Sequence, residues 1–281
     1  MPKSPKYLLI GSIEASSGKS AIILGLSNQL HQTGINVAYG KPLGKSLRES
    51  EGSLIEEDVE FITQSLNLSP NQIVPTLLGL NETTLQQRLS GKDTTDYQKS
   101  LKSEYLQDGL GDLVVLEGPG NLSEGSLFEL SLMQVAETLD AGIILVCRYK
   151  SLLAIEALLA AKELVGERLI GLVINDVPPE HLQAVTNTMS PFLEQQDIPV
   201  LGVLPNSKLL RSVTVRELFQ QLNAEVLCRK DRLNLLVESL AIGAMNVNAA
   251  VKYFRKRQNM AVVKGGDRVE IQKSELEAYT Q

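Results

Sequence analysis

Three short segments of the chain contain residue types that bind phosphate and magnesium. The first is Gly11 to Ser20, with the sequence Gly-Ser-Ile-Glu-Ala-Ser-Ser-Gly-Lys-Ser, the second is Lys41-Pro42, and the third is Glu117-Gly118. A lysine neutralises phosphate charge, and hydroxyl and carboxylate oxygens are ligands that magnesium accepts. Because each segment follows an apolar run, together they predict one site where buried strands end.

The Gly-Lys-Ser of the first segment lies between an apolar run and a helical pattern. The backbone N–H groups of such a loop and the positive end of the following helix hold phosphate, and Lys19 would act on the terminal phosphates. The usual spacing puts glycine where this chain has Ile13, so the loop is a variant, and a polar turn with a helix cap is the alternative. We predict that a nucleotide is bound by Gly11, Ser12, Glu14, Ala15, Ser16, Ser17, Gly18, Lys19 and Ser20.

The candidate magnesium ligands are Ser20 of this loop and Glu117, which follows the apolar run Leu113 to Leu116. Ligands of open α/β sheets bind at the carboxyl ends of the strands, so we expect Glu117 to lie beside the phosphate loop. A turn acid after a core strand is the alternative. Asp58, with Glu57, is a weaker candidate for the same ion, since a solvated helix face explains these residues nearly as well.

Lys41 is the second candidate catalytic residue. It follows the apolar run Ile35 to Tyr39 and would leave the sheet at the same edge. A lysine there can neutralise charge that develops during phosphoryl transfer, or it can hold an anionic substrate. Alone, Lys41 would be interpreted as a solvated loop lysine; beside the other two segments, it is predicted to belong to the site.

Short apolar runs that alternate with helical patterns would position these residues. Such runs are typical of strands buried on both faces, and strands that alternate with helices form a parallel sheet. The clearest helical patterns are Lys19 to Gln32 and Ser151 to Val165. We predict an α/β fold, a P-loop NTPase-like parallel sheet flanked by helices, with strands at Tyr7 to Ile13, Ile35 to Tyr39, Leu113 to Leu116, Gly142 to Val146, Ile170 to Ile174 and Val200 to Leu204.

Two regions depart from this alternation. The polar stretch 46–108 has helical patches at Glu56 to Ser65 and Thr83 to Leu89, and it predicts a helical insertion between two strands. The pattern changes again after the last predicted strand, and we place the domains at 1–210 and 211–281, the second being a smaller, incomplete α/β module. In this module we expect helices at Val213 to Leu222 and Val247 to Arg257 and strands at Ala224 to Leu227, Leu233 to Leu240 and Ala261 to Val263.

Composition narrows the function further. The 281 residues are 43% hydrophobic, which is enough to fill the cores of about two domains. With 33 acidic and 27 basic residues the formal net charge is −6, which argues against a general affinity for nucleic acid or anionic membranes. The two cysteines lie far apart, no apolar run approaches about 18 residues, and the start is unlike a leader. We expect a soluble, cytoplasmic protein.

The three segments, in this order, resemble those of dethiobiotin synthetase and its P-loop relatives, which include the cobyrinic acid a,c-diamide synthases. The resemblance implies a protein that binds ATP and Mg²⁺, with Lys19 and Lys41 as catalytic residues. Gly171-Leu-Val-Ile-Asn175 is similar to the family's strand that ends in an adenine-binding asparagine, and Leu201-Gly-Val-Leu-Pro205 to the strand and loop beside the base. Family analogy also implies a homodimer.

A second resemblance is to a smaller group of proteins and extends over more of the chain. Residues 10–20 look like the dethiobiotin synthetase-like amino-terminal region of long bacterial phosphotransacetylases, in which a DRTGG domain follows. Ile242 to Met245 and Lys264 to Arg268 are similar to the two recognisable stretches of that domain. The resemblance implies a protein partner or a small-molecule effector at this module, and we expect no phosphotransacetylase catalytic domain.

Departures from the family leave three functions open. The synthetases follow the magnesium glutamate with Gly-Ala-Gly-Gly, whereas this chain has Gly118-Pro119-Gly120-Asn121, and it offers no glutaminase nucleophile. The first reading is a regulatory Mg²⁺-ATP-binding protein with weak or conditional hydrolysis. The alternatives are an ATP-dependent ligase that acts on an unknown carboxylate or amine, and a non-catalytic scaffold.

Overall fold

A computed structural model of the chain describes residues 6–45, 47–50, 53–107, 109–242, 259–263 and 265, without the side chains of 47–50, 53–55 and 211. The chain divides into two compact units, Met1–Asn206 and Ser207–Gln281, which are described separately below. Three predictions lie wholly or partly outside the described residues: the helix at Val247 to Arg257 and the DRTGG-like stretches Ile242 to Met245 and Lys264 to Arg268.

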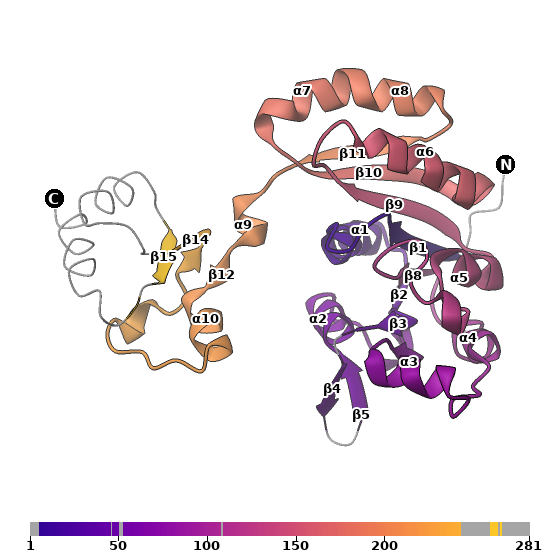
Figure 1. The fold of residues 1–281 in the computed structure, drawn as a ribbon, viewed down its shortest axis with the longest axis horizontal. Coiled ribbons are helices and arrows are strands. Elements are labelled where there is room, and N and C mark those ends of the chain that lie inside the picture. Colours follow the sequence, from indigo (N-terminus) through magenta and orange to yellow (C-terminus); the bar gives the residue numbers. More distant parts are fainter. Residues whose placement is uncertain are drawn as a thin grey trace. The chain divides into compact units, whose positions relative to one another are not determined.

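The first unit is built on a seven-stranded parallel sheet with the order β11-β10-β9-β1-β8-β2-β6 (Figure 1). The predicted parallel α/β sheet is therefore confirmed, and each predicted strand is present with bounds shifted by a few residues at most. Its strands are β1 (Tyr7–Ser12), β2 (Val37–Gly40), β6 (Ile73–Val74), β8 (Leu113–Glu117), β9 (Gly142–Arg148), β10 (Leu169–Val177) and β11 (Val200–Pro205).

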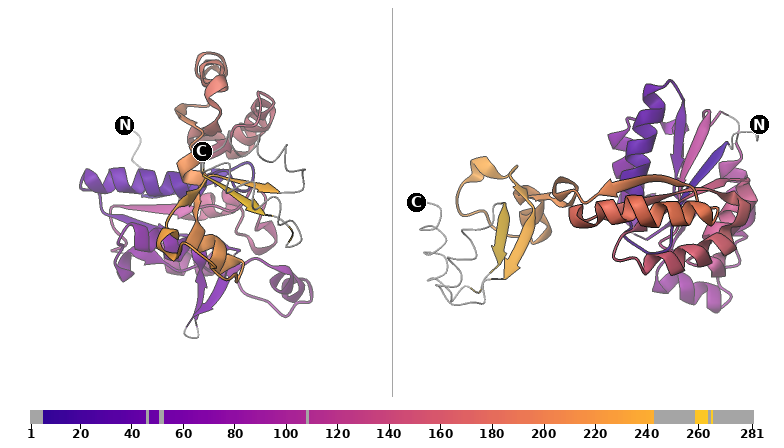
Figure 2. Two further views of the ribbon diagram at one scale, coloured as in Figure 1. Left: turned by 90° about the vertical axis from the view of Figure 1, so that its left-hand side faces the viewer. Right: turned by 90° about the horizontal axis from the view of Figure 1, so that it is seen from above.

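Helices cover both faces of this sheet (Figure 2). Successive residues of a strand point to opposite faces, and in β1 Leu8 and Ile10 join one apolar core while Tyr7 and Leu9 join the other. Apolar residues of α1 (Lys19–Gln32) and α2 (Glu57–Ser65) pack in the first core, that of Leu8 and Ile10. The second contains α4 (Tyr97–Tyr105), α5 (Leu132–Leu139), α6 (Ala154–Val165) and the run from α7 (Leu182–Ala184) to α8 (Ser190–Gln195).

The predicted insertion lies between β2 and β8. Both expected helices are present, as α2 and as α3 (Glu82–Leu89), and α4 is an additional one. The insertion also forms two small sheets that the prediction lacked, and it supplies the edge strand β6. These sheets pair β3 (Leu43–Gly44) with β7 (Leu78–Gly79) and β4 (Leu47–Ser50) with β5 (Ser53–Glu56).

The second unit corrects several expectations. Residues 224–227, predicted as a strand, form none, because they are mostly exposed and pair with no described strand. The stretch Val213 to Leu222, expected as one helix, is a short strand followed by a helix. The stretch Leu233 to Leu240, expected as one strand, contains two short strands separated by a break. The elements are α9 (Lys208–Arg211), β12 (Val213–Thr214), α10 (Val215–Gln221), β13 (Leu236–Val237), β14 (Ser239–Ile242) and β15 (Met260–Val263).

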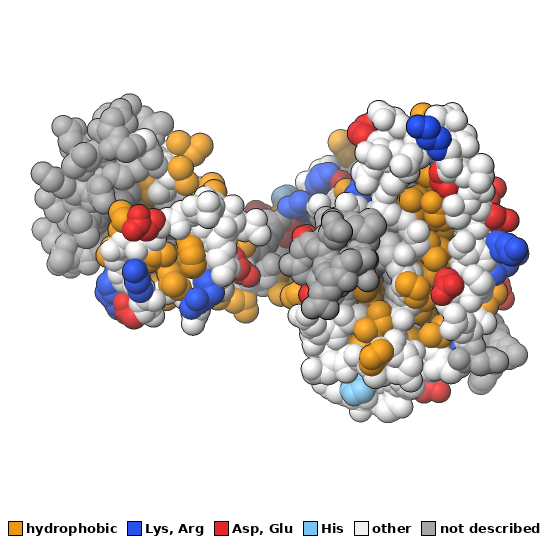
Figure 3. Space-filling view, turned by 90° about the horizontal axis from the view of Figure 1, so that it is seen from below, with side chains coloured by type: hydrophobic (Ala, Val, Ile, Leu, Met, Phe, Trp, Pro, Cys, Tyr) orange, Lys and Arg blue, Asp and Glu red, His pale blue; other side chains and the backbone are white. Residues whose placement is uncertain are grey.

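The surface of the described residues carries charges of both signs. On the face drawn in Figure 3, the described acidic and basic side chains are interspersed, and some apolar side chains reach the surface between them. None of the helices in the described part of the chain is both long and apolar enough to cross a bilayer.

Candidate functional site

The loop between β1 and α1 has an open helix end. Gly18 precedes α1 with φ +97°, a left-handed conformation that suits glycine, and a Cβ there would also collide with the Asn175 side chain. Among the described residues no side chain caps this helix, and its first turn has no acidic residue. The first N–H groups of a helix lack internal partners, so this end is an anion-binding position.

A cavity of about 420 Å³ lies in front of this helix end. It gathers residues from the loop, from the ends of β2 and β8, and from the start of α2. Of the residues predicted for the site, six loop residues, Lys41, Asp58 and Glu117 line it, whereas Gly11, Ser12, Glu14, Asn175 and Pro205 do not. The lining residues are Ala15, Ser16, Ser17, Gly18, Lys19, Ser20, Ala21, Lys41, Leu43, Lys45, Glu56, Asp58, Glu117, Gly118, Pro119, Gly120 and Glu124.

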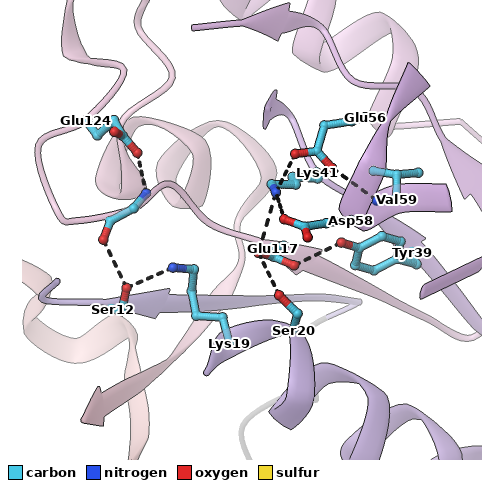
Figure 4. Close-up of polar contacts among 11 residues, drawn as sticks. Ser12, Lys19, Ser20, Tyr39, Lys41, Glu56, Asp58, Val59, Glu117 and Glu124 are labelled. Atoms are coloured by element: carbon cyan, nitrogen blue, oxygen red, sulfur yellow. Dashed lines mark hydrogen bonds and ion pairs between the residues drawn. The ribbon is translucent and has the colours of Figure 1, made fainter. Parts of the chain in front are cut away.

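Lys19 points from the start of α1 toward the end of β1 (Figure 4). Its Nζ donates to Ser12 Oγ at 3.0 Å, and Ser12 Oγ in turn donates to the carbonyl of Glu14 at 2.7 Å. Burial lowers the pKa of Lys19, and the neighbouring Glu117 only partly offsets this effect. A buried ammonium that contacts a neutral hydroxyl is able to exchange that contact for a phosphate.

Glu117 ends β8 inside the cavity. Tyr39 donates its hydroxyl proton to Glu117 Oε2 at 3.0 Å, and Ser20 Oγ donates to Glu117 Oε1 at 3.3 Å. Burial raises the pKa of Glu117, although Lys41 acts in the opposite direction. The two predicted magnesium ligands, Ser20 and Glu117, are therefore in direct contact, while Tyr39 is a partner that the sequence analysis missed.

Lys41 lies among three carboxylates. Its Nζ donates to Glu56 Oε1 at 2.6 Å and to Asp58 Oδ2, and it lies 3.7 Å from Glu117 Oε1. Burial alone would lower the pKa of Lys41, but Glu117 and the hydrogen bonds to Asp58 and Glu56 outweigh it and raise the pKa. Glu56 was not among the predicted residues, because it looks like an ordinary acidic residue at a helix start.

The remaining predicted residues have other contacts. Gly11 packs against Leu132, whose side chain a Cβ would meet at 2.6 Å. Glu14 forms an ion pair with Lys150. Asn175 Nδ2 donates to the carbonyl of Ser17 at 2.9 Å and so supports the loop from β10, which is separated from β1 by β9. Pro205, at the end of β11, is exposed.

The residues present suit a phosphate chain with a bound cation. Ser17 Oγ is buried and has no hydrogen-bond partner among the described residues, although Ser17 lines the cavity. No group of three or more His, Cys, Asp or Glu side chains in the described part of the chain is arranged to hold a metal on its own. A cation here would therefore need phosphate oxygens or water beside Ser20, Asp58 and Glu117.

A parallel sheet whose first strand leads through a Gly-Lys-Ser loop into an uncapped helix defines a P-loop NTPase-like protein. Comparison with known families agrees with this class. The chain belongs to the AAA domain family, which matches residues 6–214, and residues 217–281 match the DRTGG domain. The resemblance to dethiobiotin synthetase-like P-loop proteins is thereby confirmed.

The chain is also similar to parts of larger proteins. A phosphate acetyltransferase of Synechocystis sp. is 26% identical over 282 residues, which cover 97% of this chain and 39% of that protein. A cobyric acid synthase of Vibrio parahaemolyticus is 26% identical over 94% of this chain and 59% of its own length. This chain thus spans less than two thirds of the length of either relative.

Two solved structures have limited similarity to this chain. One is a plasmid partition protein from Borrelia burgdorferi bound to AMPPNP, with a TM-score of 0.45 and 16% identity over 82% of this chain and 94% of that one. The other is the septum site-determining protein MinD from Pyrococcus horikoshii with Mg-ADP, with a TM-score of 0.44 and 16% identity over 74% and 84%.

Proposed function

We propose that this protein binds Mg²⁺-ATP in the cavity in front of α1 and that the bound state is transmitted to the DRTGG domain or to a partner. The observation that carries the proposal is the buried Lys19 at the start of α1, whose Nζ donates to the neutral hydroxyl of Ser12, a contact that a phosphate can replace. Backbone N–H groups of residues 15–20 would hold the phosphates, and Lys19 would neutralise the terminal ones.

Magnesium belongs to the proposal because of Ser20 and Glu117. Their oxygens already meet at 3.3 Å, and Asp58 accepts from the Lys41 ammonium beside them. A bound cation would bring these oxygens and the phosphates to one centre and offset the charge of both. Asn175 would approach the base from the strand end beside the loop, with Pro205 farther along the neighbouring strand.

A regulatory role is favoured over fast catalysis for two reasons. The synthetases follow the magnesium glutamate with Gly-Ala-Gly-Gly, whereas here Pro119 replaces the alanine and Asn121 the last glycine, and Gly120 N–H donates to Glu124. A domain of a different family follows the P-loop unit. We propose further that the protein acts in the cytoplasm as a homodimer, with domains at 1–210 and 211–281.

Calorimetric titration with ATP, GTP and ADP, each with and without Mg²⁺, tests the proposal. We expect ATP to bind more tightly with Mg²⁺ than without it, and more tightly than GTP. Turnover should stay well below the ~10 s⁻¹ that is typical of enzymes. Absence of nucleotide binding under all conditions would contradict the proposal and favour the scaffold alternative.

An ATP-dependent ligase is the second candidate, and Lys41 favours it. A cation beside the terminal phosphate would stabilise a transferring phosphoryl group, and the exposed Lys45 at the same cavity could meet an anionic acceptor. If the protein is a ligase, ADP release should depend on one member of a panel of carboxylic acids and diamines. Equal basal turnover with every member of the panel would exclude it for that panel.

A further inference from the structure

Lys41 is surrounded by the carboxylates that a cation would need. Its Nζ contacts Asp58 and lies 3.7 Å from Glu117 Oε1, the same oxygen that accepts from Ser20. The ammonium is itself largely buried, with 9% of the Lys41 side chain exposed. A positive charge therefore already lies beside the two carboxylates expected to hold magnesium (Figure 4).

Glu56 differs from the other two carboxylates in what else it does. Its Oε1 accepts from Lys41 at 2.6 Å, and its Oε2 caps α2 by accepting from the N–H of Val59 at 3.1 Å. Only 1% of its side chain is exposed, against 48% for Asp58. Glu56 is thus fixed by the helix start, whereas Asp58 is free to turn toward another partner.

We propose that the Lys41 ammonium occupies the cation position of the nucleotide-free protein, and that Glu56 is the positioning residue that keeps Lys41 in the cavity when a metal ion displaces it. This inference rests on the proposed function of the same site. A divalent ion and the ammonium repel one another in so small a space, so Mg²⁺ enters only when Lys41 leaves Asp58 and Glu117. The terminal phosphate offers Lys41 a new partner, while its bond to Glu56 is kept.

This exchange couples the metal to the nucleotide. Without a nucleotide, a metal ion would have to displace Lys41 with no compensating contact for the ammonium. With a nucleotide, the phosphates bring negative charge for both cations. The wild-type protein should therefore bind divalent ions weakly on their own and more tightly with ATP.

The test is Mn²⁺ binding to the full chain without nucleotide, followed by electron paramagnetic resonance of free Mn²⁺. Lys41→Met removes the ammonium and keeps a side chain of similar length, and it should bind Mn²⁺ at least ~10-fold more tightly than wild type. Lys102→Met is the matched control, because Lys102 is exposed on α4, on the other side of the sheet, and it should leave Mn²⁺ affinity unchanged.

A second variant guards against misfolding. Lys41→Met leaves Glu56 buried without its cation, so the double variant Lys41→Met with Glu56→Gln removes one charge of each sign and retains an oxygen that can cap α2. It should fold and also bind Mn²⁺ at least ~10-fold more tightly than wild type, through Asp58 and Glu117. An equal Mn²⁺ affinity in wild type and in a folded variant would overturn the inference.

The same titrations separate this inference from the proposed function. If wild type binds Mg²⁺-ATP but the variants gain no affinity for Mn²⁺ alone, the exchange is wrong and the nucleotide site stands. If wild type binds no nucleotide while the variants gain Mn²⁺ affinity, the ammonium does occupy a cation position, and the proposed function fails. Glu56→Asp in an otherwise wild-type chain should give intermediate coupling between Mn²⁺ and ATP, since the shorter carboxylate holds Lys41 less well.

Discussion

The phosphate loop and the carboxylate cluster each bury one lysine in the same cavity, and they shift its pKa in opposite directions. Lys19, which donates to the neutral Ser12, has a lowered pKa because burial dominates. Lys41, among Glu56, Asp58 and Glu117, has a raised pKa because the carboxylates outweigh burial. The difference shows that burial does not decide the pKa of a lysine by itself: Lys19 donates to a neutral hydroxyl, whereas Lys41 donates to carboxylates.

The largest effect is expected where the lysine of the phosphate loop is removed. Lys19→Met should weaken ATP binding by at least ~100-fold, or ~2.8 kcal/mol, because the terminal phosphates lose their nearest cation. Calorimetry measures this loss, with Lys102→Met as the control. An affinity within about threefold of wild type would show that the two lysines do not differ as described.

Removing the charge of Glu117 should affect only the part of ATP binding that depends on metal. In wild type we expect Mg²⁺ to raise ATP affinity by about 30-fold, and in Glu117→Gln by less than about threefold. The amide keeps the shape of the side chain and an oxygen for Tyr39. ATP affinity without Mg²⁺ should not fall, because the variant removes negative charge near the phosphates. An undiminished Mg²⁺ effect would contradict the assignment.

The hydrogen bond from Tyr39 to Glu117 should matter mainly for stability. Tyr39→Phe removes the phenolic hydroxyl and leaves Glu117 Oε2, which is buried, without that donor. A hydrogen bond to a charged group contributes about 2 kcal/mol, so the free energy of unfolding should fall by that amount. Urea unfolding of wild type and variant measures it, and no loss of stability would mean that water replaces the hydroxyl.

The smallest effects are in the pH dependence of stability, where the two lysines should have opposite signs. The raised pKa of Lys41 gives a stabilising contribution that is complete below the ordinary lysine value of 10.5 and is lost as pH rises through the folded-state pKa. The lowered pKa of Lys19 penalises its charged form, so its contribution to stability increases as pH rises through that pKa toward 10.5.

Methionine variants separate the two contributions. The stability difference, wild type minus Lys41→Met, should be constant below pH 10.5 and shrink above it. The difference, wild type minus Lys19→Met, should rise as pH increases toward 10.5. Chemical unfolding in nucleotide-free buffer between pH 8 and 11.5 measures both, and slopes of the same sign would refute the contrast.

Much of the first unit could be predicted from the sequence because its signals are local. A strand buried on both faces is a continuous apolar run, and the Gly-Lys-Ser loop is contiguous between β1 and α1. The position of Glu117 followed from a general property of parallel sheets, since adjacent strands end at the same edge.

The missed contacts are those that join distant positions. Tyr39 meets Glu117 across 78 residues of sequence, and Glu56 meets Lys41 because the insertion folds back over the end of β2. Nothing in the type or spacing of these residues indicates the pairing. The wrong strand at 224–227 has a related cause, because a short apolar run becomes a strand only when a partner strand is available.

A crystal structure of the full chain with a nonhydrolysable ATP analogue and Mg²⁺ tests the central claim most directly. We expect phosphates on the N–H groups of residues 15–20, Lys19 moved from Ser12 to the phosphates, and a metal ion beside Ser20 and Glu117. Lys41 should still contact Glu56. A nucleotide bound elsewhere, or an empty loop with Lys19 still on Ser12, would contradict the account.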